Sequence, residues 1–319
     1  MKKSVVALMV LIGIIVGVGA VEAATAVASN GSKSAEAAPA GGDTGAVAVA
    51  WNQELLHIVQ TPGAQPATIH PTRSFAILQA AIYDSVVSIT KDDRPYIVAV
   101  PAARDSRVDA AAAQAGHDAL VALYPKFQTE LDSQLASELA AIPEGTAKQN
   151  GIQVGQSVAA KVLSLRTNDG SLNTPPPFVA GTQPGDFRPV PPAFAAPVFT
   201  GWASVKPFVL DSASQFRPDA PPAVTSAAYA AALNEVKSLG QNTSTTRTAD
   251  ETVTAKFWAG PIWNTWNEIA DNAAVAHHSN LETTSRLLAV LNLSFADGVI
   301  AFYDAKYQYA VWRPVTAIR

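Results

Sequence analysis

Large apolar side chains recur every three or four residues along most of this chain, which is the spacing of helices that bury one face. No stretch shows the two-residue alternation that is typical of a half-buried strand. The clearest stripes are formed by Val47, Trp51, Leu55 and Ile58 and by Phe75, Leu78, Ile82, Val86 and Ile89. The pattern therefore predicts an all-α fold.

Prolines and capping residues mark where the predicted helices begin and end. Pro71 suits the first turn of the second helix, and Pro125 and Pro143 end two later ones. Thr248 and Glu251 have the spacing of a capping box. Further helices are expected at about 107–124, 127–142, 145–165, 225–240, 248–260 and 261–278.

The last predicted helix is the longest. Ser279 and Glu282 have the spacing of a second capping box, and the helical pattern continues to about Trp312. A helix of this length implies a central position in the fold. Its buried stripe is expected to contain Leu287, Val290, Leu291, Ser294 and Gly298.

Residues 174–222 differ in amino-acid composition from the predicted helices. They hold about half of the chain's 22 prolines, which remove backbone donors and fix φ, so this stretch is not helical. Aromatic residues recur through it, whereas disordered chains are poor in them. They are Phe178, Phe187, Phe194, Phe199, Trp202, Phe208 and Phe216. We therefore expect a long, ordered crossover that wraps the helical body.

The N-terminal residues predict export. Two lysines precede an apolar run from Val5 to about Val21, and a small-x-small cleavage pattern ends at Ala23. Residues 1–23 therefore predict a cleaved signal peptide, with an uncleaved membrane anchor as the alternative. The expected location is periplasmic or extracellular, with no membrane association after cleavage. Residues 24–46, rich in Ala, Ser, Gly and Thr, predict a flexible linker, and 47–319 form the helical domain.

The composition excludes several kinds of functional site. The chain has no cysteine, which excludes disulfides, thiolate nucleophiles and Cys-ligated metals. Its net charge of -4 gives no reason to expect nucleic acid as a partner. His277 and His278 are adjacent, and neighbouring residues do not easily point at one ion, so no metal-ligating cluster is predicted there.

Lys306 and Arg313 are the candidate site residues. Because they are seven residues apart, they would lie on nearly the same face of a helix, about 10 Å apart along its axis. Pro314 disfavours helical geometry at Arg313, which places this residue at or just past the helix end. A lysine point charge and an arginine fork together suit a tetrahedral oxyanion. The aromatic residues expected to limit water access are Tyr303, Tyr307, Tyr309 and Trp312.

The spacing alone also fits a simpler interpretation. Two cations at the end of a helix complement its dipole and often lie in solvent. Asp297 and Asp304 are also seven residues apart. Their carboxylates fit either acid–base chemistry or ion pairs with Arg or Lys on a neighbouring helix.

The residues themselves carry a resemblance to a known superfamily. Lys306, six further residues, Arg313 and Pro314 match K-x6-R-P, the first signature of the superfamily that unites vanadium-dependent haloperoxidases, type 2 phosphatidic acid phosphatases and bacterial class A acid phosphatases. The segment from Arg286 resembles the haloperoxidase branch, with its Arg-Leu start, mid-helix Asp297 and aromatic-rich end. WNQELLHIV, RSFAILQAAIYDSVVSI, SQFRPDAPP and STTRTADETVTAKFWAG also resemble bacterial members, so the resemblance covers roughly residues 47–319.

The resemblance implies an all-α fold built around two four-helix bundles, with vanadate as cofactor. In that chemistry hydrogen peroxide binds the vanadium, Lys306 would polarise the peroxide, and Arg313 would balance charge on the vanadate oxygens. A halide then attacks to give hypohalous acid. The implied partners are therefore a small-molecule oxyanion, peroxide and halide. The phosphatases use the same cradle for phosphate, so an acid phosphatase is an alternative.

Two further signatures of the superfamily, P-S-G-H and S-R-x5-H, do not occur in the 319 residues. The second carries the histidine that binds vanadium, and none of the chain's five histidines stands in a matching motif. We therefore expect a C-terminally truncated haloperoxidase-like protein that neither holds vanadate tightly nor turns over. Its incomplete bundle would expose apolar faces, which favours a homo-oligomer or a completing chain. A non-catalytic secreted helical binding protein is the remaining alternative.

Overall fold

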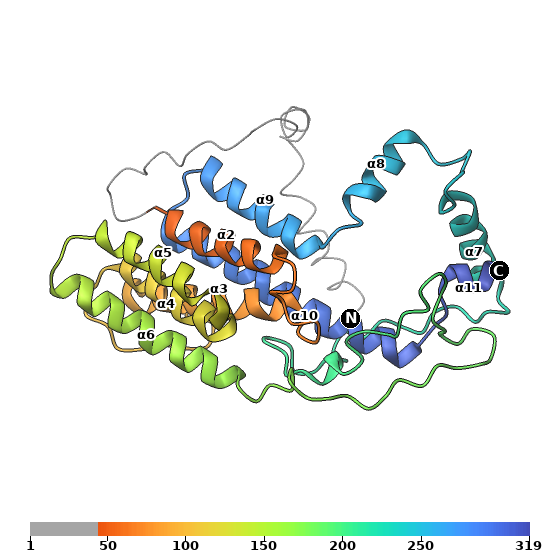
Figure 1. The fold of residues 1–319 in the computed structure, drawn as a ribbon, viewed down its shortest axis with the longest axis horizontal. Helices are drawn as coiled ribbons and strands as arrows, with labels where there is room; N and C mark the ends of the chain where they lie inside the picture. Colours follow the sequence, from red (N-terminus) through yellow and green to blue (C-terminus); the bar gives the residue numbers. More distant parts are fainter. Residues whose placement is uncertain (1–43) are drawn as a thin grey trace. The chain divides into compact units, whose positions relative to one another are not determined.

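The computed structural model describes residues 44–319, which contain helices, turns and one isolated bridge between Asp186 and Val311 but no β-strand. The all-α prediction is confirmed. The first five helices are α2 (Ala46–Gln60), α3 (Pro71–Thr90), α4 (Val108–Leu123), α5 (Gln128–Ala140) and α6 (Thr146–Arg166) (Figure 1). The predicted signal peptide and most of the predicted linker lie outside the described residues, and Ala46, the last residue of that linker, already belongs to α2.

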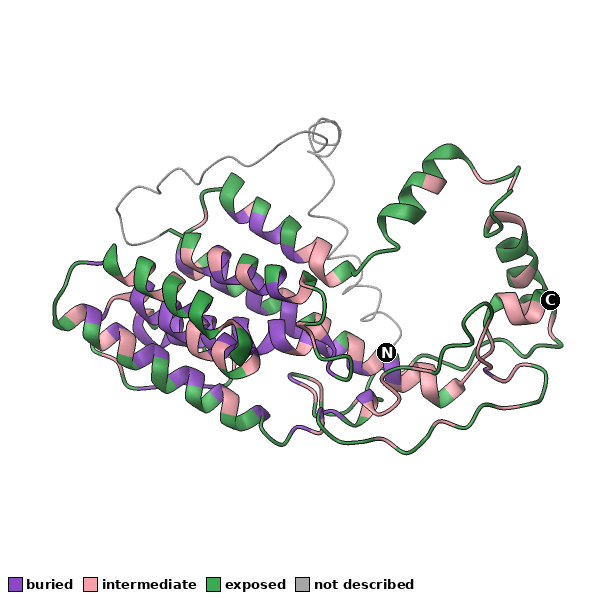
Figure 2. Cartoon of the chain, in the orientation of Figure 1, coloured by how far each residue is buried: buried purple, intermediate pink, exposed green. Residues whose placement is uncertain are grey.

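Helix α3 lies at the centre of this group, because it packs against α2, α4, α6 and α10 (Leu281–Tyr309). Every residue from Ser74 to Ile89 is buried (Figure 2). A buried carboxylate needs partners, and Asp84 accepts the backbone N–H groups of Tyr96, Ile97 and Val98 at 2.6, 3.1 and 2.8 Å. Helix α3 therefore both fills the core and holds the loop that follows it.

The C-terminal helices are α7 (Ala227–Leu239), α8 (Ala249–Phe257), α9 (Ile262–Ala276), α10 and the short α11 (Pro314–Ile318). The predicted capping box is present at α8, where Thr248 and Glu251 each accept the other's backbone N–H. Helices α7 and α8 bury no residue, whereas α9 packs on α2 and α10. Within residues 44–319, α10 alone is long and apolar enough by composition to cross a membrane, and a helix at the centre of a folded core meets the same criterion.

Helix α10 begins and ends differently from its prediction. Asn280, not Ser279, caps it, because the Asn280 side chain accepts the Thr283 N–H at 2.8 Å. It ends at Tyr309, where Ala310 turns left-handed with φ 42°. The next residues leave the helix to pair with the segment around Asp186, so the helix stops before Trp312.

The predicted buried stripe of α10 is wrong. Leu287 and Val290 are 41% and 59% exposed. The face that packs on the rest of the protein instead contains Leu281, Leu288, Ala289, Leu293, Ala296 and Ile300. Helix α10 is apolar on two faces, it packs against α3, and the face that contains Leu288, Ala289 and Ala296 is the buried one.

Residues 167–226, here called the crossover, connect α6 to α7 with one short 3-10 turn, η2 (Trp202–Ser204). Phe187, Trp202 and Phe208 are buried, as the aromatic pattern predicts. Phe194 and Phe216 are each 62% exposed and do not pack in this way. Some aromatic side chains of the crossover are thus packed in the protein interior, and others are exposed.

Candidate oxyanion site

Lys306 lies in the last turn of α10 in a largely apolar setting. Its Nζ is 5.6, 5.1 and 5.4 Å from the ring centres of Phe302, Tyr303 and Tyr307. Burial lowers the pKa of Lys306, and the positive charge of Arg313 lowers it further. Within residues 44–319 no carboxylate pairs with this amine.

Arg313 lies beyond the end of α10, in extended backbone with φ -79° and ψ 153°. This conformation agrees with the restriction that Pro314 imposes on the residue before it. The Arg313 side chain is exposed and, in the part of the chain that the structure describes, has no hydrogen bond or ion pair. The positive charge of Arg313 still lowers the pKa of Lys306. It also lowers the pKa of Tyr307, which burial raises. The two cations are therefore close enough to interact, although only Lys306 is helical.

Aromatic rings enclose the inner side of Lys306. Tyr303 stacks on Tyr307 with ring centres 6.0 Å apart. Two residues of the crossover extend this cluster, since Phe199 lies 5.4 Å from Tyr303 and Phe178 lies 5.4 Å from Tyr307. Burial raises the pKa of Tyr303 to about 12, with a smaller contribution from Tyr307, so its hydroxyl stays protonated.

The four predicted aromatic neighbours divide into two groups. Tyr303 and Tyr307 adjoin Lys306, whereas the Tyr309 hydroxyl donates to the Pro218 carbonyl at 2.6 Å and the Trp312 indole donates to Tyr229. Phe302 was not predicted from the sequence as a neighbour of Lys306. Its position four residues before Lys306 was the available signal, because residues at that spacing are neighbours on a helix.

The carboxylates of Asp297 and Asp304 both bind the crossover to α10. Arg217 donates two hydrogen bonds to Asp304 at 2.5 and 2.7 Å, in a bidentate pair. Asp297 accepts three successive backbone N–H groups, those of Phe208, Val209 and Leu210, at 2.6, 2.7 and 2.8 Å. The ion-pair interpretation thus holds for Asp304, although its partner lies in the crossover and not on a neighbouring helix.

His70 is the histidine most closely connected with this cluster. It caps α3, where its Nδ1 accepts the Thr72 N–H, and its ring centre lies 4.6 Å from Trp263 and 6.0 Å from Tyr303. Burial lowers the pKa of His70 to about 4, so the ring is neutral at pH 7. Tyr303 thus lies near both His70 and Lys306.

The other histidines lie elsewhere in the fold. His57 and His117, on α2 and α4, approach carboxylates, while His277 and His278 follow α9. Over residues 44–319 no group of three or more His, Asp or Glu side chains is arranged to hold a metal ion.

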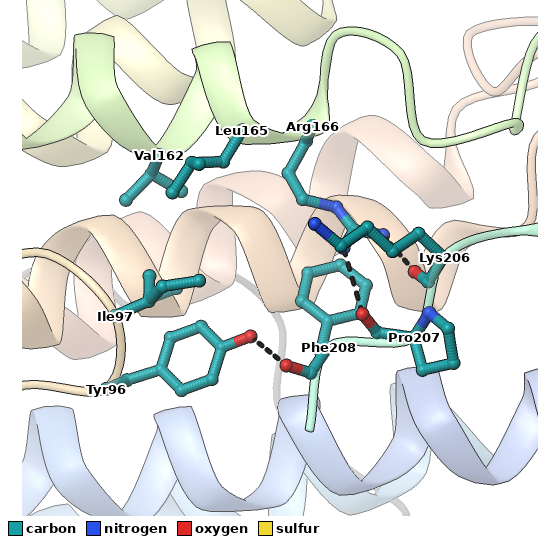
Figure 3. Close-up of a pocket in the computed structure, with 9 residues that line it drawn as sticks. Tyr96, Ile97, Val162, Leu165, Arg166, Lys206, Pro207 and Phe208 are labelled. Atoms are coloured by element: carbon teal, nitrogen blue, oxygen red, sulfur yellow. Dashed lines mark hydrogen bonds between the residues drawn. The ribbon is translucent and has the colours of Figure 1, made fainter. Parts of the chain in front are cut away.

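A small cavity lies between α6, the loop after α3 and the crossover (Figure 3). Its volume is about 40 Å³, which suits water molecules and not a larger ligand. The Arg166 guanidinium stacks on Phe208 at 3.8 Å and donates to the carbonyls of Lys206 and Pro207. This cation already has hydrogen-bond partners, whereas the side chains of Lys306 and Arg313 have none in residues 44–319.

Comparison with known proteins shows likeness at the level of structure. No family model matches the chain, and no curated protein matches it in sequence. Among solved structures, a bacterial vanadium-dependent iodoperoxidase superposes with a TM-score of 0.73 at 23% identity, over 89% of this chain and 74% of that chain. A bacterial vanadium-dependent chloroperoxidase in its holo form superposes with a TM-score of 0.57 at 16% identity, over 82% of this chain and 67% of that chain. The chain therefore has the all-α fold of the bacterial vanadium-dependent haloperoxidases.

Proposed function

We propose that Lys306 and Arg313 are the cationic part of an oxyanion site, in a protein of the haloperoxidase type. The observation that carries the proposal is a partly buried lysine that has no carboxylate partner in the described residues and whose pKa is lowered further by the charge of Arg313, a second cation without a partner there. Leaving two such cations together is unfavourable unless an anion joins them. The surrounding rings limit water access and strengthen that attraction.

The donor set fits vanadate in part. An ammonium and a planar guanidinium suit the oxygens of a tetrahedral oxyanion. Bound vanadate would supply the activation of hydrogen peroxide for halide oxidation. Lys306 would hold and polarise an oxygen atom near Nζ, and Arg313 would balance negative charge from the solvent side. The histidine that the resemblance assigns as vanadium ligand has no counterpart in contact with either cation in the described part of the chain.

For a protein made of these 319 residues alone we expect weak binding and no turnover. The loss of one donor from such a site lowers turnover about 100- to 1000-fold. Binding of vanadate and of phosphate should both be measurable by titration calorimetry. Robust bromination of a dye with vanadate and peroxide would contradict the expectation of inactivity.

The test of the site uses Lys306→Ala and Arg313→Ala. Each should weaken vanadate binding about 10-fold or more, since a hydrogen bond to a charged group contributes about 1.5–3 kcal/mol. Lys256→Ala is the matched control, because Lys256 also lies in the last turn of a helix and is exposed. Equal binding by all four proteins would refute the proposal. Turnover of a phosphate monoester without halide oxidation would favour the phosphatase alternative.

Export to the periplasm or the extracellular space is part of the proposal and rests on the sequence of residues 1–23. N-terminal sequencing of the protein after secretion tests it, with Ala24 expected as the first residue. Assembly with a second copy or a completing chain is likewise proposed. Light scattering of the purified protein distinguishes a monomer from an oligomer.

A further inference from the structure

The three residues before Arg313 are held by the crossover. After Ala310 turns left-handed, the Phe187 N–H donates to the Ala310 carbonyl at 2.6 Å, and the Trp312 N–H donates to the Gly185 carbonyl at 2.8 Å. These two bonds flank the isolated bridge between Asp186 and Val311. The backbone that leads to Arg313 is therefore fixed by a segment more than a hundred residues earlier in the chain.

The side chain of Trp312 is held from two further directions. Its Nε1–H donates to the hydroxyl of Tyr229 in α7. The Arg188 guanidinium lies 5.9 Å from the indole ring, and the Gln183 carbonyl accepts a hydrogen bond from Arg188 at 3.0 Å. The indole is thus in contact with both α7 and the crossover.

The chain after Arg313 is anchored to the same helix. Pro314 begins α11, and α11 packs against α7. Arg313 consequently has fixed backbone on both sides, while its own side chain has no partner in the described residues. Its direction depends on how Trp312 and α11 sit on α7.

We propose that Tyr229 is a positioning residue for Arg313, acting through the indole of Trp312. The inference rests on the proposed oxyanion site and deepens it: a helix remote in sequence determines where the second cation of that site lies. Tyr229 itself need not touch the anion. Its hydroxyl fixes the indole, and the indole fixes the backbone from which the guanidinium extends.

The effect on Lys306 provides a readout that does not depend on anion binding. The positive charge of Arg313 contributes to the lowered pKa of Lys306. If Arg313 loses its fixed position, the repulsion weakens and the pKa of Lys306 rises toward its ordinary value. Competitive acetylation followed by mass spectrometry measures this pKa at one lysine in the full chain.

The experiment compares Tyr229→Phe with the unchanged protein and with Tyr96→Phe. The Tyr229 hydroxyl accepts one hydrogen bond, from Trp312, and the Tyr96 hydroxyl donates one, to the Phe208 carbonyl, so Tyr96→Phe is the control for losing one tyrosine hydroxyl bond. Tyr229→Phe should raise the pKa of Lys306 and weaken vanadate binding about 2- to 10-fold, the range of one net hydrogen bond. Tyr96→Phe should change neither quantity.

A double variant tests whether the effect passes through Trp312. Trp312→Phe removes the indole donor, so adding Tyr229→Phe to it should produce no further change in the pKa of Lys306. Arg313→Gln sets the upper limit of the pKa rise. An unchanged Lys306 pKa in Tyr229→Phe, or a further rise in the double variant, would overturn the inference.

The two proposals fail in different ways. If Lys306→Ala leaves vanadate binding unchanged, the oxyanion site is refuted, and the pKa of Lys306 still decides whether Tyr229 positions Arg313. If Lys306→Ala weakens binding but Tyr229→Phe changes only the pKa of Lys306, the positioning of Arg313 by Tyr229 is confirmed, and its contribution to anion binding is refuted.

Discussion

The Nε2 atom of His117 on α4 lies 2.8 Å from Oδ1 of Asp132 on α5. The other ring nitrogen, Nδ1, lies 2.8 Å from Oδ1 of Asp118. Both nitrogens face carboxylates, so the arrangement favours the doubly protonated, charged ring. Helix α5 buries only Leu131, and this charged contact adds a side-chain link between α4 and α5.

This contact predicts a pH-dependent stability. The hydrogen bond with Asp118 is the main cause that raises the pKa of His117, burial opposes it, and Asp132 adds to it. A raised folded pKa means that the contribution is fully present below about pH 6.5 and is lost as pH rises through the folded pKa. Unfolding in urea between pH 5.5 and 8.5 should show this loss, of about 1 kcal/mol or less because Asp132 is half exposed.

In His117→Gln, the loss of unfolding free energy between pH 5.5 and 8.5 that is due to this histidine should be absent. His57→Gln is the control, because the His57 side chain is 59% exposed and lies 3.7 Å from Glu130. Hydrogen exchange of α5 gives a local readout: relative to the intrinsic exchange rate at each pH, the protection of α5 should fall at high pH in the unchanged protein and not in His117→Gln. Identical profiles for His117→Gln and the unchanged protein would show that the histidine contact contributes nothing.

Asp271 on α9 predicts a second pH effect. Its two carboxylate oxygens accept from Nδ2 of Asn52 at 3.0 Å, and burial raises its pKa to about 7. Because the folded state holds this proton more tightly than the unfolded state, the free energy of unfolding should fall as pH rises from about 4 to 7. In Asp271→Asn this decrease in the free energy of unfolding, on the order of 2 kcal/mol, should be absent. The check is urea unfolding at pH 5.0 and 8.0; the same decrease in the variant would contradict the assignment.

Asp297 should contribute strongly to the stability of the crossover. Replacing it with asparagine removes the charge from three short backbone hydrogen bonds, and the amide has one oxygen where the carboxylate has two. Hydrogen bonds to charged groups contribute about 1.5–3 kcal/mol, so Asp297→Asn should lower the free energy of unfolding by about 2 kcal/mol or more. Hydrogen exchange at Phe208–Leu210 should accelerate. Asp211→Asn, an exposed carboxylate in the same segment, should change neither measurement.

The helices and their approximate ends were predictable because prolines, capping residues and apolar spacing are local signals. The capping box of Thr248 and Glu251 is an example. At the start of α10, Ser279 and Asn280 are both good capping residues, and spacing alone did not decide between them. The buried face of α10 was missed for a different reason. Both of its faces are apolar, and only packing against α3 selects one.

The two cations of the candidate site stay a prediction from the sequence. Their seven-residue spacing placed both on one helix face, but the helix ends at Tyr309 and Arg313 lies beyond it. The crossover contacts that hold this segment join residues about a hundred positions apart, through backbone groups that carry no sequence signal. Arg217 and Asp304 likewise gave no sign that they would pair with each other. Such contacts become visible only in the folded chain.

Two glycines on different helices should respond in opposite directions to replacement by alanine. Alanine favours a helix over glycine by about 1 kcal/mol, so Gly298→Ala, with no atom within 4 Å of the added Cβ, should raise the melting temperature. At Gly155 the added Cβ would lie 2.4 Å from the Ala111 carbonyl oxygen of α4. Backbone cannot move aside as a side chain can, so Gly155→Ala should lower the free energy of unfolding by about 1–3 kcal/mol. Thermal unfolding of both variants under one condition makes each the control for the other, and a stabilising Gly155→Ala would mean that α4 and α6 are less closely packed than described.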